Sequence, residues 1–278
     1  LEGGRGWIMK PIAVLYHANC WDGFCAAWVA RKWFKTVEVE YLPVQYGQPP
    51  PPIPDEHEVI IVDFSYDAAT LRALHAVHRH VVILDHHKTA QDELQPLLDA
   101  HIPGLEGVFD LTESGATLAW NYCALDTKTM PALFKYLRDR DLWQWQLPKS
   151  QEVSAALWSH PRTFAAWSEF LQLEDIYELQ REGAAILRDR QHTIDTHVAR
   201  AVMGTIAGYQ VPIVNATTLI SEIGHALCER YPEALFSVSY YDTKDAKRIW
   251  ALRSTDKLDV GALAKTRGGG GHPNAAGF

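Results

Sequence analysis

The sequence predicts an α/β protein in which a parallel sheet carries helices on both faces, joined by a helical linker to a smaller C-terminal α/β domain. Two observations lead to this prediction. In the first half, short continuous apolar runs alternate with segments whose apolar residues recur at helical spacing. Beyond residue 110 helical patterns dominate, and strand patterns return only at Val211. Continuous apolar runs are typical of strands buried on both faces, as in parallel sheets.

The first half contains five predicted strands, because most of these runs are apolar and rich in β-branched residues. The strands are Ile12–Tyr16, Val37–Val44, Val59–Val62, Val81–Leu84 and Gly107–Phe109. Between them, apolar positions at helical spacing predict helices over Phe24–Phe34 and Ala68–His80. Gln48–Pro54 contains five prolines in seven residues, which predicts a stiff surface loop.

The second half begins with helical patterns. Helices are expected over Ser114–Cys123, Pro131–Arg138 and Thr163–Leu171. A charged stretch from Asp175 to about Val202 predicts a long connecting helix with a solvated face. The last part adds a helix over Leu219–Arg230 and strands at Val211–Val214, Leu235–Tyr241 and Ile249–Arg253. We therefore predict a first domain over residues 9–185, a helical linker over 186–204 and a second domain over 205–278.

The composition excludes several classes of protein. The chain has 278 residues, and a hydrophobic fraction of 47% excludes a disordered chain. No stretch approaches the roughly 20 consecutive apolar residues of a membrane-spanning helix, so no membrane partner is expected. Lys and Arg number 26 against 34 Asp and Glu, and the net charge of −8 disfavours long duplex DNA as a partner.

The cysteines and the N-terminus carry little further signal. Cys20, Cys25, Cys123 and Cys228 form no CxxC pair, so no structural zinc knuckle is expected. No secretory signal peptide is recognisable, which predicts a cytoplasmic protein with reduced thiols. Residues 1–7, which precede Met9, fit either an ordered extension or an expression remnant.

Side chains of the metal-ligand type follow three of the predicted strands. They are His17 and Asp22 after the first strand, Asp63 after the third, and Asp85, His86 and His87 after the fourth. Each alone fits a structural role such as a helix cap, but the carboxyl ends of parallel strands meet at one edge of the sheet. Carboxylates and imidazoles together suit Mn²⁺, with Fe²⁺, Mg²⁺ and Zn²⁺ as alternatives. More carboxylates than one ion needs suggest two ions about 3.5–4 Å apart.

The last eleven residues, Gly268–Phe278, read GGGGHPNAAGF. Glycine loses much backbone entropy when it is fixed, so neither a strand nor a helix is expected here. Successive glycine amides can form a nest for a phosphate or carboxylate, and His272 could donate to a phosphate oxygen. A flexible terminus is the alternative interpretation.

Four motifs together resemble the DHH phosphoesterase superfamily. They are HANCWDGFCAA at His17–Ala27, VDFS at Val62–Ser65, DHH at Asp85–His87 and the terminal GGGGHPNAAGF. More narrowly, the chain resembles the two-domain branch with a DHH-associated C-terminal domain. That branch includes nanoRNases, phosphoadenosine-phosphate phosphatases and cyclic-dinucleotide phosphodiesterases. The resemblance implies two Mn²⁺ ions bridged by Asp63.

The resemblance also implies a role for each motif residue. One ion would take His17 and the residue at position 20, and the other would take Asp22, His86 and Asp141, with Asp139 as a neighbouring alternative. Asp85 would orient an imidazole and His87 would face the phosphate. Asp139 and Asp141 also fit a surface charge cluster with Arg138 and Arg140.

Position 20 departs from the family pattern, because many members have aspartate there and this chain has Cys20. The thiol fits either a soft metal ligand or a structural cysteine. We therefore predict weaker binding at the first metal site than a full carboxylate set gives.

In the second domain the resemblance implies contacts with the far end of the substrate. The residues concerned are Arg253, Ser254, Asn215, Gly270, Gly271 and His272. Arginine can pair with phosphate through two parallel hydrogen bonds. A solvated arginine and a turn asparagine are the alternatives for Arg253 and Asn215.

We expect a metal-dependent phosphoesterase that hydrolyses short nucleotide substrates to 5′-mononucleotides by metal-activated water. The substrate would be a dinucleotide, a nanoRNA or a 3′-phosphorylated nucleotide (pAp). Alternatives are a single-strand-specific 5′ exonuclease like RecJ, an exopolyphosphatase or pyrophosphatase, and a non-catalytic nucleotide sensor. The exonuclease would need stacking aromatics, which Trp143, Trp145, Trp158 and Trp167 could supply if they are not core residues. A homodimer is compatible with the sequence.

Overall fold

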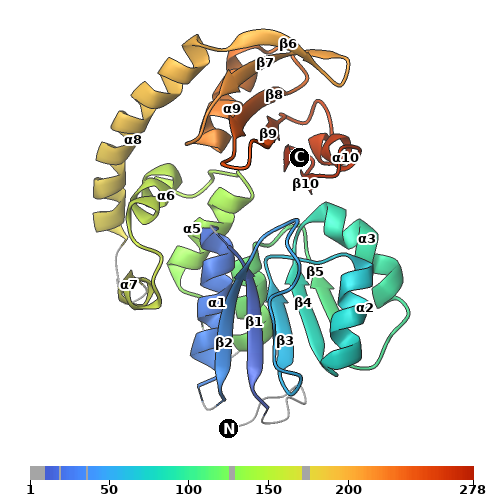
Figure 1. The fold of residues 1–278 in the computed structure, drawn as a ribbon. Coiled ribbons are helices and arrows are strands. Elements are labelled where there is room, and N and C mark those ends of the chain that lie inside the picture. The colour runs from blue at the N-terminus through green and yellow to red at the C-terminus, as the bar shows by residue number, and fades with distance from the viewer. Residues whose placement is uncertain (1–9, 19, 36, 125–128, 171–175) are drawn as a thin grey trace. The chain divides into compact units, whose positions relative to one another are not determined.

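The computed structural model describes residues 10–18, 20–35, 37–124, 129–170 and 176–278. The chain forms two compact units, residues 1–183 and residues 184–278 (Figure 1). Within the described residues, no helix is both long enough and apolar enough to span a membrane.

The first unit is built on a five-stranded parallel sheet, as the sequence predicts. Its strands are β1 (Ile12–His17), β2 (Val39–Val44), β3 (Glu58–Val62), β4 (Val81–Asp85) and β5 (Leu105–Phe109). Their order across the sheet is β2-β1-β3-β4-β5, and every neighbouring pair is parallel. After β2 the chain crosses back over β1 to form β3, so the order reverses between β1 and β3. Such a reversal is where open α/β sheets bind their ligands.

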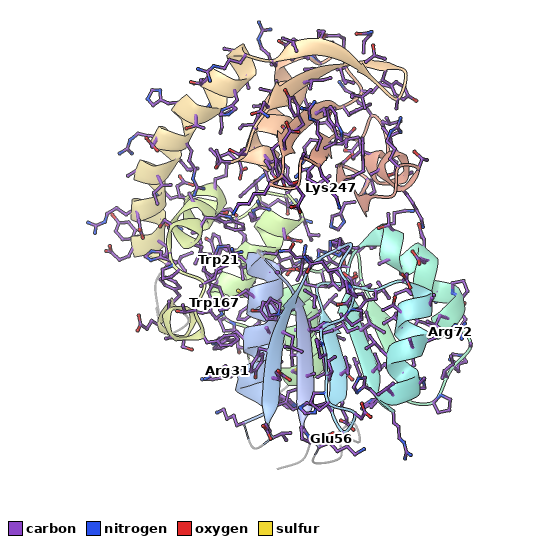
Figure 2. All side chains as sticks on the ribbon, in the orientation of Figure 1. Trp21, Arg31, Glu56, Arg72, Trp167 and Lys247 are labelled. Atoms are coloured by element: carbon purple, nitrogen blue, oxygen red, sulfur yellow. The ribbon has the colours of Figure 1, made fainter. Side chains whose placement is uncertain are left out.

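Helices cover both faces of this sheet because its central strands are apolar at nearly every position. One face packs under α1 (Trp21–Trp33), α4 (Gly115–Ala124), α5 (Ala132–Asp141), α6 (Ser150–Ser159) and α7 (Phe164–Phe170). The other face packs under α2 (Ala68–Val77) and α3 (Lys88–Leu98), which lie together in Figure 1. Successive strand residues alternate between the two cores: Val14 faces the first and Leu15 the second. Trp21 and Trp167 are buried in the first core with ring centroids 5.7 Å apart (Figure 2).

The second unit is a mixed sheet with helices. Its strands are β6 (Val202–Ile206), β7 (Tyr209–Asn215), β8 (Ser237–Asp242), β9 (Arg248–Arg253), β10 (Gly270–His272) and β11 (Ala275–Gly277). They lie in the order β10-β11-β9-β8-β7-β6, and only β7 and β8 are parallel. The helices are α9 (Ile220–Arg230) and α10 (Val260–Lys265). Helix α8 (Tyr177–Ala199) runs from the end of the first unit into the second.

Several sequence-based expectations need correction. The connecting helix ends at Ala199, and Val202, expected at its end, begins β6; Asp175 lies outside the described residues. The glycine-rich tail, for which no strand was expected, forms the hairpin β10–β11. Hydrogen bonding of β11 to β9 compensates the entropy that glycine loses. Helices α3, α6 and α10 were not predicted.

Candidate metal centre

The first ligand candidates lie where β1 meets α1. His17 is the last residue of β1, and Trp21 begins α1 only four positions later. A β-carbon on Gly23 would collide with the backbone oxygen and β-carbon of His17. Glycine at this position therefore lets the first turn of α1, which carries Asp22, begin directly against the end of β1.

Asp22 is held by the N-terminus of a different helix. Its buried carboxylate accepts the backbone amides of Gly115 at 2.5 Å and Ala116 at 3.0 Å, in the first turn of α4. These amides have no partner within α4, and the positive end of the helix dipole favours an anion there. Amides of a helix that is remote in the sequence therefore hold the Asp22 carboxylate in place. Its Oδ2 lies 3.8 Å from Nε2 of His86.

Asp63 follows β3 directly and has a left-handed backbone, with φ of +55°. Only a few per cent of residues other than glycine adopt positive φ, although aspartate tolerates it better than most. A β-carbon on Gly115 would meet the β-carbon of Asp63, so glycine is required for α4 to approach this turn. Gly115 was missed in the sequence, where its only signal is a small residue at the start of a helical pattern.

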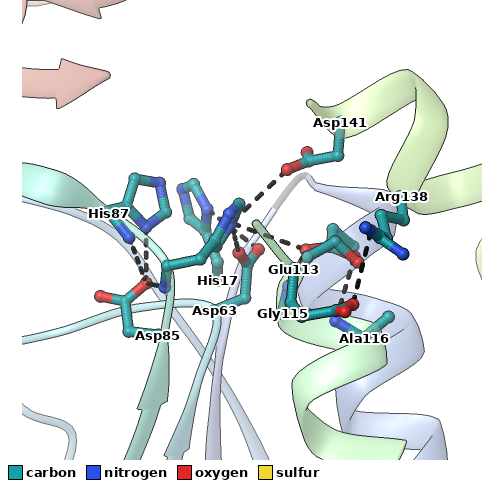
Figure 3. A network of polar contacts seen from close by, with 12 residues as sticks. His17, Asp63, Asp85, His87, Glu113, Gly115, Ala116, Arg138 and Asp141 are labelled. Atoms are coloured by element: carbon teal, nitrogen blue, oxygen red, sulfur yellow. Dashed lines mark hydrogen bonds and ion pairs between the residues drawn. The ribbon is translucent and has the colours of Figure 1, made fainter. Parts of the chain in front are cut away.

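Asp85, His86 and His87 extend from the end of β4. Asp85 accepts hydrogen bonds from the hydroxyl of Ser65 at 2.6 Å and from the amide of His86 at 2.8 Å. It also accepts one from Nδ1 of His87 at 2.6 Å (Figure 3). The imidazole of His86 points the other way, and its Nε2 lies 3.0 Å from Oδ1 of Asp63. His87 is therefore hydrogen-bonded to Asp85, whereas the imidazole of His86 contacts the carboxylate cluster formed by Asp22 and Asp63.

Asp141, and not Asp139, reaches this cluster. Oδ2 of Asp141 lies 3.5 Å from Nε2 of His86. Asp139 is buried and instead accepts the backbone amides of Gln146 at 2.8 Å and Leu147 at 3.2 Å, so it holds the loop after α5. Arg138 pairs with Glu113 at 3.5 Å, which argues against a surface cluster with the two aspartates (Figure 3).

The predicted ligands of the first unit form overlapping groups. In each group, one ligand atom per residue lies within 4.8 Å of the others. The groups are His17 with Cys20 and Asp63; Asp22 with His86 and Asp141; and Asp63 with Asp85, His86 and His87. Asp63 and His86 thus connect the groups at the reversal point of the sheet.

Comparisons with known proteins bear on this architecture. No family model matches the chain. An uncharacterized protein of Acanthamoeba polyphaga mimivirus is 30% identical over 286 residues, covering 95% of this chain. The chain spans 66% of the length of that viral relative.

Among solved structures, RecJ of Thermus thermophilus in complex with Mn²⁺ aligns with a TM-score of 0.50 and 15% identity, over 97% of this chain and 49% of RecJ. The chain therefore shares the two-domain fold of RecJ. CDC45 of Entamoeba histolytica aligns with a TM-score of 0.48 and 8% identity, over 97% of this chain and 92% of CDC45. At 15% identity the likeness to RecJ is one of fold, so the narrower nanoRNase branch stays a prediction.

The electrostatics of the candidate metal centre follow from the burial of several like charges. Burial and the charges of Asp63 and Asp141 raise the pKa of Asp22 well above its usual range. Burial alone would raise the pKa of Asp63, but the imidazole nitrogens of His17 and His86, which lie 3.5 Å and 3.0 Å from its oxygens, outweigh it and lower that pKa. Burial opposes charge on His86 too, yet Asp63, Asp141 and Asp22 raise its pKa well above the ordinary value. Without a metal, protons on Asp22 and His86 therefore offset the negative charge of the buried carboxylates.

The residues present fit a divalent cation. Oδ2 of Asp63 and Oδ2 of Asp141 are buried without a hydrogen-bond partner among the described residues. Buried carboxylate oxygens are costly in that state, and a cation would satisfy them. The mixture of carboxylate and imidazole donors suits Mn²⁺, Fe²⁺ or Zn²⁺.

Cys20 lies beside His17 and Asp63, where a soft ligand could complete the first group. Burial and the charges of Asp63, Asp141 and Asp22 raise the pKa of its thiol well above the usual value. In the absence of metal the side chain is therefore a neutral thiol, and its ligation would require loss of that proton.

The substrate-contact candidates of the second unit fall into two places. In the strand register, Arg253 of β9 lies opposite Ala275 of β11, and Ala275 lies opposite His272 of β10. Arg253 and His272 therefore belong to one row across these three strands. Gly270 and Gly271 continue the same hairpin edge. Asn215 lies opposite Tyr240 of β8, whereas Arg253 lies opposite Ser237, three positions away on the same strand. Asn215 is therefore outside the row that contains Arg253.

Hydrogen bonds show which of these groups already have structural partners. Arg253 Nη2 donates to Ser221 Oγ at 2.8 Å, and the Asn215 amide donates to the carbonyl of Tyr240 at 3.2 Å. The Ser254 hydroxyl donates to the carbonyl of Leu235 at 3.0 Å. Ser254 is therefore occupied in holding its loop.

Proposed function

We propose that the chain is a divalent-metal-dependent phosphoesterase that hydrolyses short nucleotide substrates. The supporting observation is the position of Asp63 between two ligand groups, with a buried carboxylate oxygen that lacks a hydrogen bond. A carboxylate shared by two groups is the arrangement that a pair of metal ions requires. His17 and Cys20 would complete one group. Asp22, His86 and Asp141 would form the other, beside which Asp63 lies with Oδ1 3.0 Å from Nε2 of His86.

When bound, the two ions supply Lewis acidity and an activated water for attack on phosphorus. The chain's own residues orient the reaction. Asp22 is fixed by the N-terminus of α4, and Asp63 by the turn after β3. Asp85 accepts Nδ1 of His87, which leaves Nε2 as the atom that would donate to a phosphate oxygen. Burial lowers the pKa of His87, but Asp85 outweighs it and raises that pKa, which favours the positively charged imidazolium.

In the proposed reaction water adds across one phosphate ester bond. The hydroxyl goes to phosphorus, the bond from phosphorus to the leaving oxygen breaks, and the leaving oxygen takes the proton. A dinucleotide such as pApA would give two 5′-mononucleotides, and pAp would give a 5′-mononucleotide and phosphate. The net charge of −8 and the resemblance of the motifs to the DHH phosphoesterases support a short substrate.

A second candidate is a single-strand exonuclease, because the chain shares the fold of RecJ. Of the tryptophans that could stack bases, Trp167 is fully buried, whereas Trp158 is 38% exposed. Trp143 and Trp145 are half-buried and contact each other at 5.0 Å. Trp143, Trp145 and Trp158 therefore have exposed surface on which bases of a single strand could stack.

A substrate panel with Mn²⁺ tests both candidates: pApA, a five-residue RNA, pAp, cyclic dinucleotides, single-stranded DNA and polyphosphate. We expect turnover of the short nucleotides and its loss in Asp63→Ala. Degradation of long DNA alone would favour the exonuclease, and polyphosphate cleavage alone would contradict both candidates. Binding of nucleotides without turnover of any substrate would identify a sensor.

A further inference from the structure

An exposed tyrosine lies against the candidate metal centre. Tyr46 follows β2 by two residues, and 51% of its surface is exposed. Its ring centroid lies 5.4 Å from that of His17 and 5.9 Å from that of His87. Those two histidines extend from the ends of β1 and β4, the strands on either side of β3, which Asp63 follows.

The loop that carries Tyr46 is built to be stiff. The amide of Gln48 donates to the carbonyl of Gln45 at 3.3 Å and closes a turn around Tyr46 and Gly47. Gly47 has φ of +78°, which suits the third position of a type II turn. The prolines that begin at Pro49 fix the backbone beyond it. The ring is therefore positioned before any ligand arrives.

Three rings contact that of Tyr46, and about half of the residue is still exposed. Phe64, which is fully buried, packs against Tyr46 at 4.5 Å with a tilt of 38° between the rings. The imidazoles of His17 and His87 meet the ring at 74° and 76°, so they contact it edge to face. Support from Phe64 and two imidazoles, with half of the residue in solvent, is the geometry of a stacking platform.

We propose that Tyr46 is a nucleobase platform: the base of a nucleotide whose phosphate lies at the metal centre stacks on the exposed part of the ring. This inference rests on the proposed function and names its substrate class. A base-bearing nucleotide gains from the platform, whereas inorganic polyphosphate offers nothing that can stack. Stacking does not depend on which base is present, so the platform selects for nucleotides without selecting among sequences.

The test compares Tyr46→Ala and Tyr46→Phe with the wild type on pApA, on pApA that lacks either base, and on pyrophosphate, all with Mn²⁺. Phenylalanine keeps the ring and should keep kcat/KM within about twofold. Alanine should lower kcat/KM for pApA by about tenfold or more, mainly through KM, since a stacked base contributes about 1–3 kcal/mol. The abasic dinucleotide that lacks the stacked base, and pyrophosphate, should lose nothing further.

Tyr177→Ala is the matched control, because Tyr177 is 53% exposed and lies at the start of α8. An equal loss for all substrates in Tyr46→Ala, or a loss of Mn²⁺ affinity, would show a structural role and overturn the proposal. So would a loss in Tyr46→Phe as large as that in Tyr46→Ala. If the wild type hydrolyses nothing, the proposed function fails; equal binding of adenosine 5′-monophosphate by wild type and Tyr46→Ala would then overturn the platform separately.

Discussion

The backbone amide of Gly115 lies 2.5 Å from Oδ2 of Asp22, a residue 93 positions away in the sequence. The same glycine leaves room for the β-carbon of Asp63. One residue without a side chain therefore positions two of the carboxylates that the candidate metal centre needs.

Gly115→Ala should disturb the metal centre more than the fold. The added methyl group meets Asp63, and α4 cannot move away without stretching the bond from Gly115 to Asp22, so the turn that carries Asp63 must shift. Overpacking of this kind costs about 1–3 kcal/mol of stability. We expect Mn²⁺ affinity to fall by at least about tenfold, as measured by isothermal titration calorimetry.

Gly208→Ala is the control for this substitution, because Gly208 has φ of +86° but open space around it, in the second unit. It should cost stability through backbone strain alone and leave Mn²⁺ affinity unchanged. Equal Mn²⁺ affinities for Gly115→Ala and wild type would contradict the structural role given to Gly115.

Metal binding should release protons near neutral pH. The carboxylates raise the pKa of His86 well above its ordinary value, and burial with neighbouring charges raises that of Asp22. Both groups must lose their protons to act as ligands, so protons compete with the metal and affinity should fall as pH falls. Calorimetric titrations with Mn²⁺ in two buffers of different ionisation enthalpy measure this release. Identical apparent enthalpies in the two buffers would show that no proton leaves.

Asp85→Asn should weaken catalysis while metal binding persists. Nδ1 of His87 lies 2.6 Å from Oδ1 of Asp85, and loss of the carboxylate charge should bring the pKa of His87 down. Loss of such an orienting partner typically costs about 10- to 100-fold in activity. Steady-state turnover of pApA and the NMR titration of His87 measure the two effects.

Ser65→Ala is a graded comparison for that substitution, since it removes only the hydroxyl that donates to Oδ2 of Asp85 at 2.6 Å. Its effect on turnover should be smaller than that of Asp85→Asn. If Asp85→Asn turned over substrate at the wild-type rate, His87 would not depend on Asp85.

Cys20 should make the two metal sites unequal. Cys20→Asp supplies a hard oxygen beside His17 and Asp63 and should strengthen the weaker Mn²⁺ site. Cys123→Ala, at a buried cysteine of α4 outside the ligand groups, should leave both sites unchanged. Metal titrations distinguish these outcomes. Two equally tight Mn²⁺ sites in both wild type and Cys20→Ala would refute a ligand role for the thiol.

The sequence predicts the centre of the fold well because β1, β3 and β4 are continuous apolar runs that end at polar residues. That pattern places His17, Asp63 and Asp85 at one edge of the sheet, and the structure has them there. Helix α3 was missed because its buried apolar residues are few, Leu94 and Leu97, and Pro96 lies between them. Such a helix forms because tertiary packing stabilises it, and its local sequence pattern alone does not predict it.

Other features of the site depend on contacts that are remote in sequence. The tail hairpin exists because β11 pairs with β9, and no local pattern announces that pairing. The structural role of Asp139 depends on amides several positions later, whereas Asp141 meets a histidine that follows β4. Tyr46 gains its place beside His17 only through the parallel pairing of β1 with β2. Side-chain type and spacing alone could not assign these roles.

The central claim is that the Asp63 carboxylate would be shared by two metal ions. Mn²⁺ stoichiometry, measured by calorimetry or equilibrium dialysis on the wild type, Asp63→Asn and His17→Ala, tests it most directly. We predict two ions per wild-type chain, one in His17→Ala, and none bound tightly in Asp63→Asn, because both ligand groups need that carboxylate. Two tightly bound ions in Asp63→Asn would contradict the account.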